Sequence, residues 1–275
     1  MAEEERAFPF IRLNEREAKP RSRGLTEIRG PYYTPMGPRY LADVLETMGS
    51  YVDILKFAGG SFSLMPKTAV SDLIETAHRH QVLVSTGGFI EHVLTEGPAL
   101  VERYLDECAQ MGFDIVEVSN GFLSVPVEDL VRLTKRVQQH GLKAKPEVGI
   151  QFGAGGASRI DELATEGTRD VEWALQLARR HLDAGAAMIM IESEGITEQV
   201  AAWRPEVPGR FVEALGLDRV MFEAADPDVF AWYVRNYGPE VNLFVDHSQI
   251  VQLESLRSGT WGTKSLFGRV VTYKG

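Results

Sequence analysis

Eight short runs rich in β-branched residues recur along the chain, and each is followed by an amphipathic stretch that often ends near a glycine. The predicted strands cover residues 24–28, 52–57, 82–85, 114–118, 142–147, 187–192, 219–224 and 241–245. Their spacing of about 30 residues is typical of successive strand–helix units. Glycine tolerates the left-handed conformation that closes a helix, so we expect helices to end at Gly49, Gly112, Gly141, Gly185, Gly216 and Gly238.

Strands that alternate with helices form either a closed barrel or an open, doubly wound sheet. An open sheet usually carries a glycine-rich ligand motif after its first strand, but this chain reads RGPYYTPMGP there. We therefore predict a single-domain α/β protein, a (β/α)8 TIM barrel, over residues 24–258. Residues 1–23 are predicted to form an N-terminal arm, and residues 259–275 a C-terminal tail that packs on the barrel.

Charge and composition narrow the range of partners. A formal net charge of −10 disfavours nucleic acid, because binding a polyanion needs a basic surface. No apolar run approaches the roughly 20 residues that span a bilayer, and the charged N-terminus lacks a secretory signal. Cys108 is the single cysteine, which suits a reducing compartment. We expect a cytoplasmic protein that binds neither membranes nor nucleic acid.

The ends of the predicted strands carry charged and polar side chains. In a TIM barrel these ends and the loops after them build the active site. Four consecutive strands end on glutamate, namely Glu117, Glu147, Glu192 and Glu223. Each glutamate by itself could cap a helix or pair with a nearby base, but four at one mouth repel one another unless a positive charge lies among them. Magnesium, or manganese, is one candidate, and lysine is the other, offered by Lys56 and Lys145.

Glycine-rich loops follow several strands. AGGSFS (58–63) and STGGF (85–89) present backbone N–H groups that suit an anion, or else form tight turns. GAGG (153–156) is expected to form a mobile lid, and His92 lies just beyond the third strand.

Several segments resemble phosphosulfolactate synthase and its relatives. They are RGLTEI (23–28), VDILKF (52–57), STGGF (85–89), FDIVEVSNG (113–121), KPEVG (145–149), RVMFEA (219–224), VNLF (241–244) and IVQLESLR (250–257). KFAGGSFSLMP (56–66), STGGFIEHVL (85–94) and YGPEVNLFVDHSQI (237–250) are more similar still to a branch that includes plant heat-stress-associated proteins. The resemblance implies an α/β barrel, and for the founding enzymes a magnesium-dependent addition of sulfite to phosphoenolpyruvate.

The chain departs from the synthase pattern at cationic positions. After the fifth strand the synthases read Glu-Val-Gly-Lys-Lys, whereas this chain ends the same segment in Ile150 and Gln151. The Arg-bearing loop after the sixth strand is replaced by Glu192-Ser193-Glu194-Gly195. Two cations near a dianionic substrate are therefore missing, and we expect the substrate to differ.

The first hypothesis is a magnesium-dependent lyase or synthase that adds a sulfite-type nucleophile to a phosphoenolpyruvate-like enol carboxylate. Lys145, Glu147 and His92 are its candidate catalytic residues, and Lys56, Ser85, Asn120 and Gln151 its candidate substrate-binding residues. The candidate metal ligands are Glu117, Glu147, Glu192 and Glu223. The alternative is a catalytically diverged, stress-related barrel that acts through protein contacts.

We also expect a homo-oligomer, with a trimer as one option, as the resemblance implies. Aromatic residues in the arm, the first loop and the tail are candidates to cover the interface or to pack on the barrel itself. They are Phe8, Phe10, Tyr32, Tyr33, Trp261 and Phe267.

Overall fold

The computed structural model describes residues 6–156, 158–224, 226–261 and 269–273. Eight parallel strands close into a barrel in chain order, with β1 paired to both β2 and β8. The strands are β1 (Thr26–Arg29), β2 (Ile54–Lys56), β3 (Leu83–Ser85), β4 (Ile115–Val118), β5 (Lys143–Val148), β6 (Ile189–Ile191), β7 (Val220–Glu223) and β8 (Leu243–Asp246). The predicted TIM barrel is confirmed.

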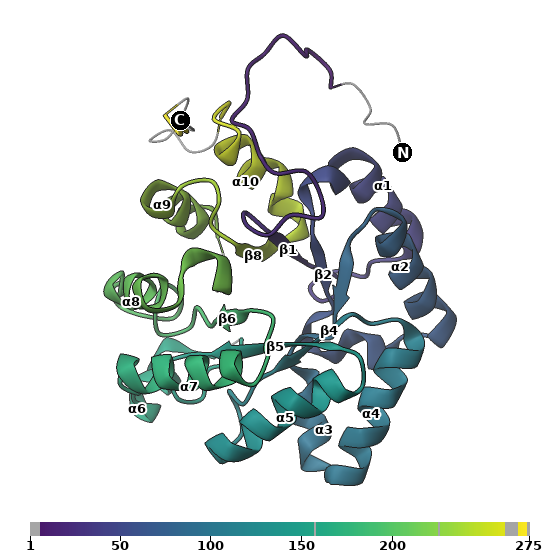
Figure 1. Cartoon of the computed structure of the whole chain (residues 1–275), viewed down its shortest axis with the longest axis vertical. Coiled ribbons are helices and arrows are strands. Elements are labelled where there is room, and N and C mark those ends of the chain that lie inside the picture. The colour runs from purple at the N-terminus through teal and green to yellow at the C-terminus, as the bar shows by residue number, and fades with distance from the viewer. Residues whose placement is uncertain (1–5, 157, 225, 262–268, 274–275) are drawn as a thin grey trace.

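Helices surround the strands on the outside (Figure 1). The α-helices are α1 (Pro38–Met48), α2 (Lys67–Arg79), α3 (Ile90–Thr95), α4 (Pro98–Met111), α5 (Val127–Gln139), α6 (Ile160–Glu166), α7 (Val171–Asp183), α8 (Glu206–Leu215), α9 (Pro227–Tyr237) and α10 (Ile250–Arg257). Short 3-10 turns are η1 (Gly49–Tyr51), η2 (Ala58–Leu64), η3 (Gly87–Phe89), η4 (Leu217–Arg219) and η5 (His247–Gln249). None of the described helices is long and apolar enough to cross a bilayer.

The predicted helix ends are confirmed, since each of the six glycines lies one or two residues after the end of an α-helix. Gly112 has φ +92° at the end of α4, where the left-handed conformation closes the helix. Gly49 has φ −61° instead, because the chain continues from α1 directly into a 3-10 turn.

The core has two parts. Most buried apolar side chains lie between the strands and the helices, including the stripe of Val101, Leu105 and Cys108 on α4. A second, smaller cluster is formed by Ile54, Ile115, Met188, Met190, Met221 and Phe244. Residues two apart on a strand point to the same side of the sheet. The residue two places after each member of this cluster therefore points to the same side as that member. That spacing determines where the charged side chains lie.

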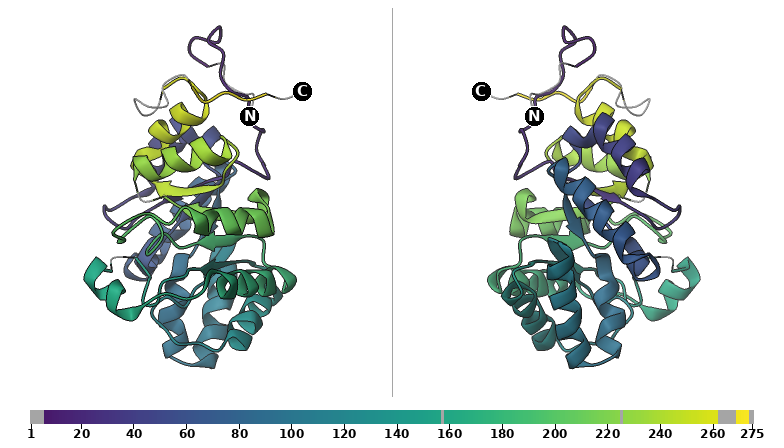
Figure 2. Two further views of the ribbon diagram at one scale, coloured as in Figure 1. Left: turned by 90° about the vertical axis from the view of Figure 1, so that its left-hand side faces the viewer. Right: turned by 90° about the vertical axis from the view of Figure 1, so that its right-hand side faces the viewer.

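The N-terminal arm is tied to the barrel by basic side chains. Arg16 pairs with Glu254 of α10, Arg21 Nε lies 3.0 Å from Asp53 Oδ1, and Lys19 Nζ donates to the carbonyl of Gly49. The arm and α10 accordingly lie at the same end of the molecule (Figure 2). In the tail, the Val270 carbonyl accepts a hydrogen bond from Asn14 of the arm. Phe267 lies outside the described residues.

Candidate active site

A layer of charged side chains fills the carboxyl end of the barrel interior. It follows from the two-residue alternation along each strand: Ile115 precedes Glu117, Met190 precedes Glu192, and Met221 precedes Glu223. On β2, Ile54 likewise precedes Lys56. The apolar cluster is therefore covered by a polar layer at the barrel mouth.

Four buried side chains and the half-buried Glu147 form one ion-pair chain, in the order Glu27, Lys145, Glu117, Lys56 and Glu147. Lys145 Nζ donates to Glu27 and lies 3.2 Å from Glu117 Oε2. Lys56 Nζ lies 2.7 Å from Glu117 Oε1 and 4.0 Å from Glu147 Oε2. A buried charge is tolerated when it is paired, and here the two lysines alternate with the carboxylates. Lysine thus supplies positive charge among the strand-end glutamates.

The ion-pair chain sets the protonation of its members. Burial favours the neutral form of Glu117, but the Lys56 and Lys145 ammonium groups outweigh burial and lower its pKa. Burial likewise disfavours the charged form of Lys56, yet Glu117 and Glu147 raise its pKa. Lys56 therefore keeps its charge while it faces the mouth.

Three further carboxylates behave differently, and we call Glu147, Glu192 and Glu223 the upper glutamates. Burial, followed by the charge of Glu117, raises the pKa of Glu147 well above its ordinary value. Burial and the neighbouring Glu223 do the same for the pKa of Glu192. Glu223 lies 3.0 Å from Arg29 Nη2, whereas Glu192 accepts a hydrogen bond from the Glu194 amide and has no basic side chain within 4.0 Å among the described residues. Burial thus favours the protonated form of the upper glutamates, whereas the two lysines favour the carboxylate form of Glu117.

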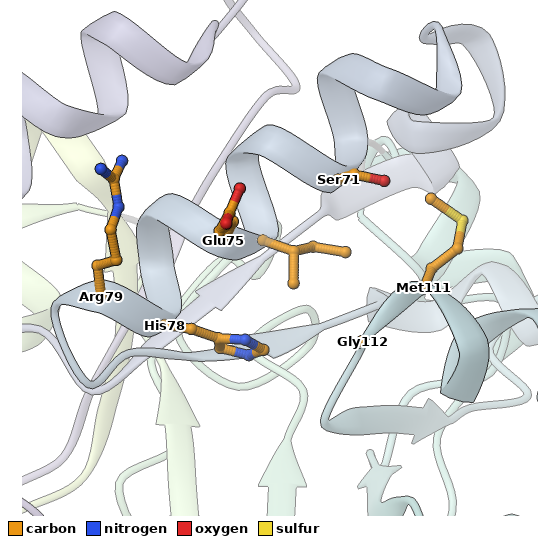
Figure 3. A pocket seen from close by; sticks show the side chains of 7 residues that line it. Ser71, Glu75, His78, Arg79, Met111 and Gly112 are labelled. Carbon is orange, nitrogen blue, oxygen red and sulfur yellow. The ribbon is translucent and has the colours of Figure 1, made fainter.

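A cavity of about 280 Å³ opens onto this layer. Arg29, Lys56, Glu117 and the upper glutamates line its floor, and aromatic side chains line its entrance. Another hollow lies on the outer helices, lined by Ser71, Ile74, Glu75, His78, Arg79, Met111 and Gly112 (Figure 3). It contains none of the strand-end residues, so we place the candidate site at the barrel mouth.

The predicted metal site, with four carboxylate ligands, stays a prediction. No group of three or more His, Cys, Asp or Glu side chains in the described part of the chain has an arrangement that holds a metal ion. Glu117 engages two lysines, one with each carboxylate oxygen, which does not suit a metal ligand. Magnesium in enzymes is often held by only one or two carboxylates together with water and substrate oxygens. Glu192 and Glu223, whose carboxylates repel each other, fit that smaller role.

Three predicted substrate-binding residues do not line the cavity. Ser85 is fully buried, and its hydroxyl accepts a hydrogen bond from the Gly87 amide. The Gln151 amide donates to the backbone carbonyls of Phe152, Leu163 and Gly167, so it ties the loop after β5 to the end of α6. Asn120 is half-buried beside Ser119, which does line the cavity. Lys56 is the candidate that reaches the cavity, and His92 lies at its edge, 5.3 Å from the Phe89 ring centroid.

Sequence reasoning missed Glu27 and Arg29 of β1. The first strand was predicted to end at residue 28, one residue before Arg29. Glu27 and Arg29, which point to the same side of this strand, were therefore not recognised as a pair. The signal was the alternation Glu27, Ile28, Arg29, which matches the pattern of Lys145 and Glu147 on β5. Arg29 adds a second cation that faces the cavity.

Two loops at the mouth are held by glutamates of the chain itself. Glu194 accepts hydrogen bonds from the amides of Gly155, Gly156 and Ser158 at 3.0, 3.3 and 2.9 Å, so the expected lid segment is tied to the loop after β6. Glu91 accepts from the amides of Gly121 and Phe122 at 3.0 and 2.9 Å. Both sets of N–H groups are the kind that bind anions in other proteins.

Comparison with known proteins gives consistent similarities. The family model for (2R)-phospho-3-sulfolactate synthase (ComA) matches residues 14–263. Protein HEAT-STRESS-ASSOCIATED 32 of Arabidopsis thaliana is 40% identical over 258 residues, which cover 90% of each chain. Phosphosulfolactate synthase of Methanothermobacter thermautotrophicus is 27% identical over 263 residues, covering 93% of this chain and 96% of that protein.

Among solved structures, the carboxyl transferase domain of Rhizobium etli pyruvate carboxylase with 3-hydroxypyruvate has a TM-score of 0.60 at 15% identity. The match covers 82% of this chain and 40% of that chain. At this identity the likeness concerns the barrel fold alone.

Proposed function

Because this chain belongs to the (2R)-phospho-3-sulfolactate synthase family, we propose that it is a lyase-type enzyme that adds a nucleophile to an unsaturated carboxylate at the barrel mouth. The family resemblance seen in the sequence is thus confirmed, and it supports chemistry of the lyase or synthase type. The substrate, the nucleophile and the residue roles below are our proposal.

The observation that carries the proposal is Lys56, a charged lysine held at the cavity floor beside a glutamate that retains its proton. Its ammonium group lies 2.7 Å from Glu117 Oε1 and 4.0 Å from Glu147 Oε2. A cation placed in advance in a water-poor site stabilises charge that develops on the substrate. Lys56 is therefore proposed to bind the substrate carboxylate and to stabilise the negative charge that spreads into it.

Glu147 is proposed to act as the general acid. In the addition, a lone pair of the nucleophile forms a bond to the terminal carbon of the double bond. The π electrons move toward the carbon beside the carboxylate, and that carbon then takes a proton. Burial and the charge of Glu117 raise the pKa of Glu147, which favours the protonated form that a donor at this step needs. Glu147 then regains its proton from solvent through the cavity.

Magnesium remains part of the proposal in a reduced form. Glu192 and Glu223 would hold the ion, and when bound it would supply positive charge near a substrate oxygen. The alternative function, a barrel that acts only through protein contacts, does not explain the buried charges at the mouth. Burying several charges costs free energy, and a protein that acts through contacts elsewhere on its surface has no need of them.

The proposal is tested with purified protein, magnesium, sulfite and a panel of unsaturated carboxylates in D2O. Mass spectrometry should detect a product that carries one deuterium at the carbon beside the carboxylate. Glu147→Gln is expected to lower kcat by about a hundredfold or more, since it removes the proton donor. Lys56→Met is expected chiefly to weaken substrate binding.

Lys143→Met is the matched control, because Lys143 is an exposed residue on the same strand as Glu147. Its activity should equal that of the wild type. A Glu147→Gln variant with undiminished kcat would show that another residue donates the proton.

A further inference from the structure

Four aromatic side chains at the cavity entrance have no part in the mechanism above. We call Tyr32, Tyr33, Phe89 and Phe122 the aromatic rim; they come from the segments after β1, β3 and β4 and all line the cavity. Tyr33 is 70% exposed and Phe122 64% exposed. Large apolar side chains gathered around a cavity mark a binding surface more often than single exposed ones do.

Glycines make room for three of these rings. A Cβ atom at Gly59 would lie 2.3 Å from the Tyr32 ring, and one at Gly60 would lie 2.0 Å from Phe89. A Cβ at Gly155 would lie 2.3 Å from Phe122. Each ring thus occupies space that a side chain at the glycine would fill. The backbone of the glycine-rich loops therefore packs directly against the rim.

The cavity floor offers a place for one carboxylate beneath the rim. Arg29, Lys56 and, at the edge, His92 are the described basic residues that line the cavity. Arg29 pairs with Glu223 at 3.0 Å and Lys56 with Glu117 at 2.7 Å, so a ligand carboxylate would share these cations with carboxylates of the chain. The Arg29 guanidinium lies 5.0 Å from the centroids of the Tyr33 and Phe244 rings, and Lys56 Nζ lies 4.4 Å from that of Phe244. A ligand whose carboxylate meets these cations therefore has its remaining atoms directed toward the aromatic rim.

A second anionic group on the ligand finds its natural partners already engaged. The amides of Gly155, Gly156 and Ser158 hold Glu194, and those of Gly121 and Phe122 hold Glu91. A phosphate would have to displace one of these carboxylates before it could reach the loop amides.

We infer that the ligand of this site is a monocarboxylate whose unsaturated carbon chain carries an aromatic or extended apolar group, rather than an enol phosphate. The inference deepens the proposed function and rests on it for the carboxylate position at Lys56. The rim then provides apolar contact area, and edge-on or offset contacts between rings add specificity.

The test compares three probes by isothermal titration calorimetry on the full chain with magnesium present. Cinnamate carries a phenyl ring on an unsaturated monocarboxylate, acrylate lacks the ring, and phosphoenolpyruvate carries a phosphate instead. We expect cinnamate to bind at least about tenfold more tightly than acrylate, because the ring leaves water. Phosphoenolpyruvate should bind no more tightly than acrylate.

A variant of an exposed rim residue separates a specific effect from misfolding. Phe122→Ala should weaken cinnamate binding about threefold to tenfold and leave acrylate binding unchanged. Phe10→Ala, which removes an 80% exposed ring from the arm, is the matched control and should change neither. Lys56→Met should weaken the binding of both acids.

The outcomes distinguish this inference from the proposed function. Equal affinities for cinnamate and acrylate, or tighter binding of phosphoenolpyruvate than of cinnamate, would overturn the inference alone, provided that Lys56→Met still weakens acrylate. If Lys56→Met leaves acrylate binding unchanged, or if none of the three acids binds, the proposed carboxylate site is wrong and the inference falls with it.

Discussion

Replacing Lys145 by methionine tests the ion-pair chain directly. Lys145 is 2% exposed and pairs with both Glu27 and Glu117. Methionine preserves much of the side-chain volume but leaves two buried carboxylates without that cation. Removing one member of a buried ion pair typically costs about 3–5 kcal/mol in the free energy of unfolding. For a chain of this length that corresponds to a fall in Tm of roughly 5–15 °C.

The assay is urea unfolding followed by circular dichroism, with Lys143→Met as the control. Lys143 lies two residues earlier on β5 but is exposed, so its replacement should change the free energy of unfolding by no more than about 0.5 kcal/mol. Adding Glu27→Gln to Lys145→Met should recover part of the loss, because one of the stranded carboxylates is removed. If Lys145→Met and Lys143→Met differ by less than about 1 kcal/mol, the ion-pair chain does not stabilise the barrel as described.

Four further outcomes are expected. The pKa of Glu192 is raised above 4.5, so the folded state binds more protons than the unfolded state, and the free energy of unfolding should fall as the pH rises from about 4.5. Glu192→Gln should therefore reduce this dependence on pH and stabilise the protein at pH 7. Glu117→Gln removes a carboxylate of lowered pKa and should destabilise the protein at pH 7. Calorimetric titration with magnesium should show binding about tenfold or more weaker in Glu192→Gln than in wild type, and equal affinities would rule out Glu192 as a ligand. The rate of phosphosulfolactate formation from sulfite and phosphoenolpyruvate, followed by mass spectrometry, should be on the order of a hundredfold or more below that of an active synthase. Gln151→Lys should not restore this rate, because the side chain at position 151 faces backbone carbonyls rather than the cavity. Light scattering at micromolar concentration should give the mass of a homo-oligomer, and a mass near 30.6 kDa would refute that expectation.

The aromatic residues first considered for an oligomer interface divide into two groups. Tyr32 and Tyr33 line the cavity, so the structure gives them a place at the candidate site. Phe8 and Phe10 in the arm are 66% and 80% exposed. They are the better candidates for contact with another copy of the chain.

Both the architecture and the charged character of the mouth follow from patterns along the chain. Period-two strands, amphipathic stretches and glycines recur at a spacing that closes a barrel, and these signals are local along the chain. The glutamates at 117, 147, 192 and 223 were recognisable for the same reason, since each lies within one residue of the end of a strand.

The pairing of those charges, by contrast, depends on closure of the barrel. Lys145 contacts Glu27, which lies 118 residues earlier in the chain, because closure of the barrel brings β1 and β5 to opposite walls of one narrow interior. The same closure gives Glu117 two lysines and leaves Glu192 with none among the described residues, although the two glutamates have equivalent positions on their strands. Loop residues follow no period, so the sequence did not reveal that Gln151 points away from the cavity and that Glu194 holds the loop beside it. Their directions depend on which backbone groups the folded loops bring within hydrogen-bonding distance.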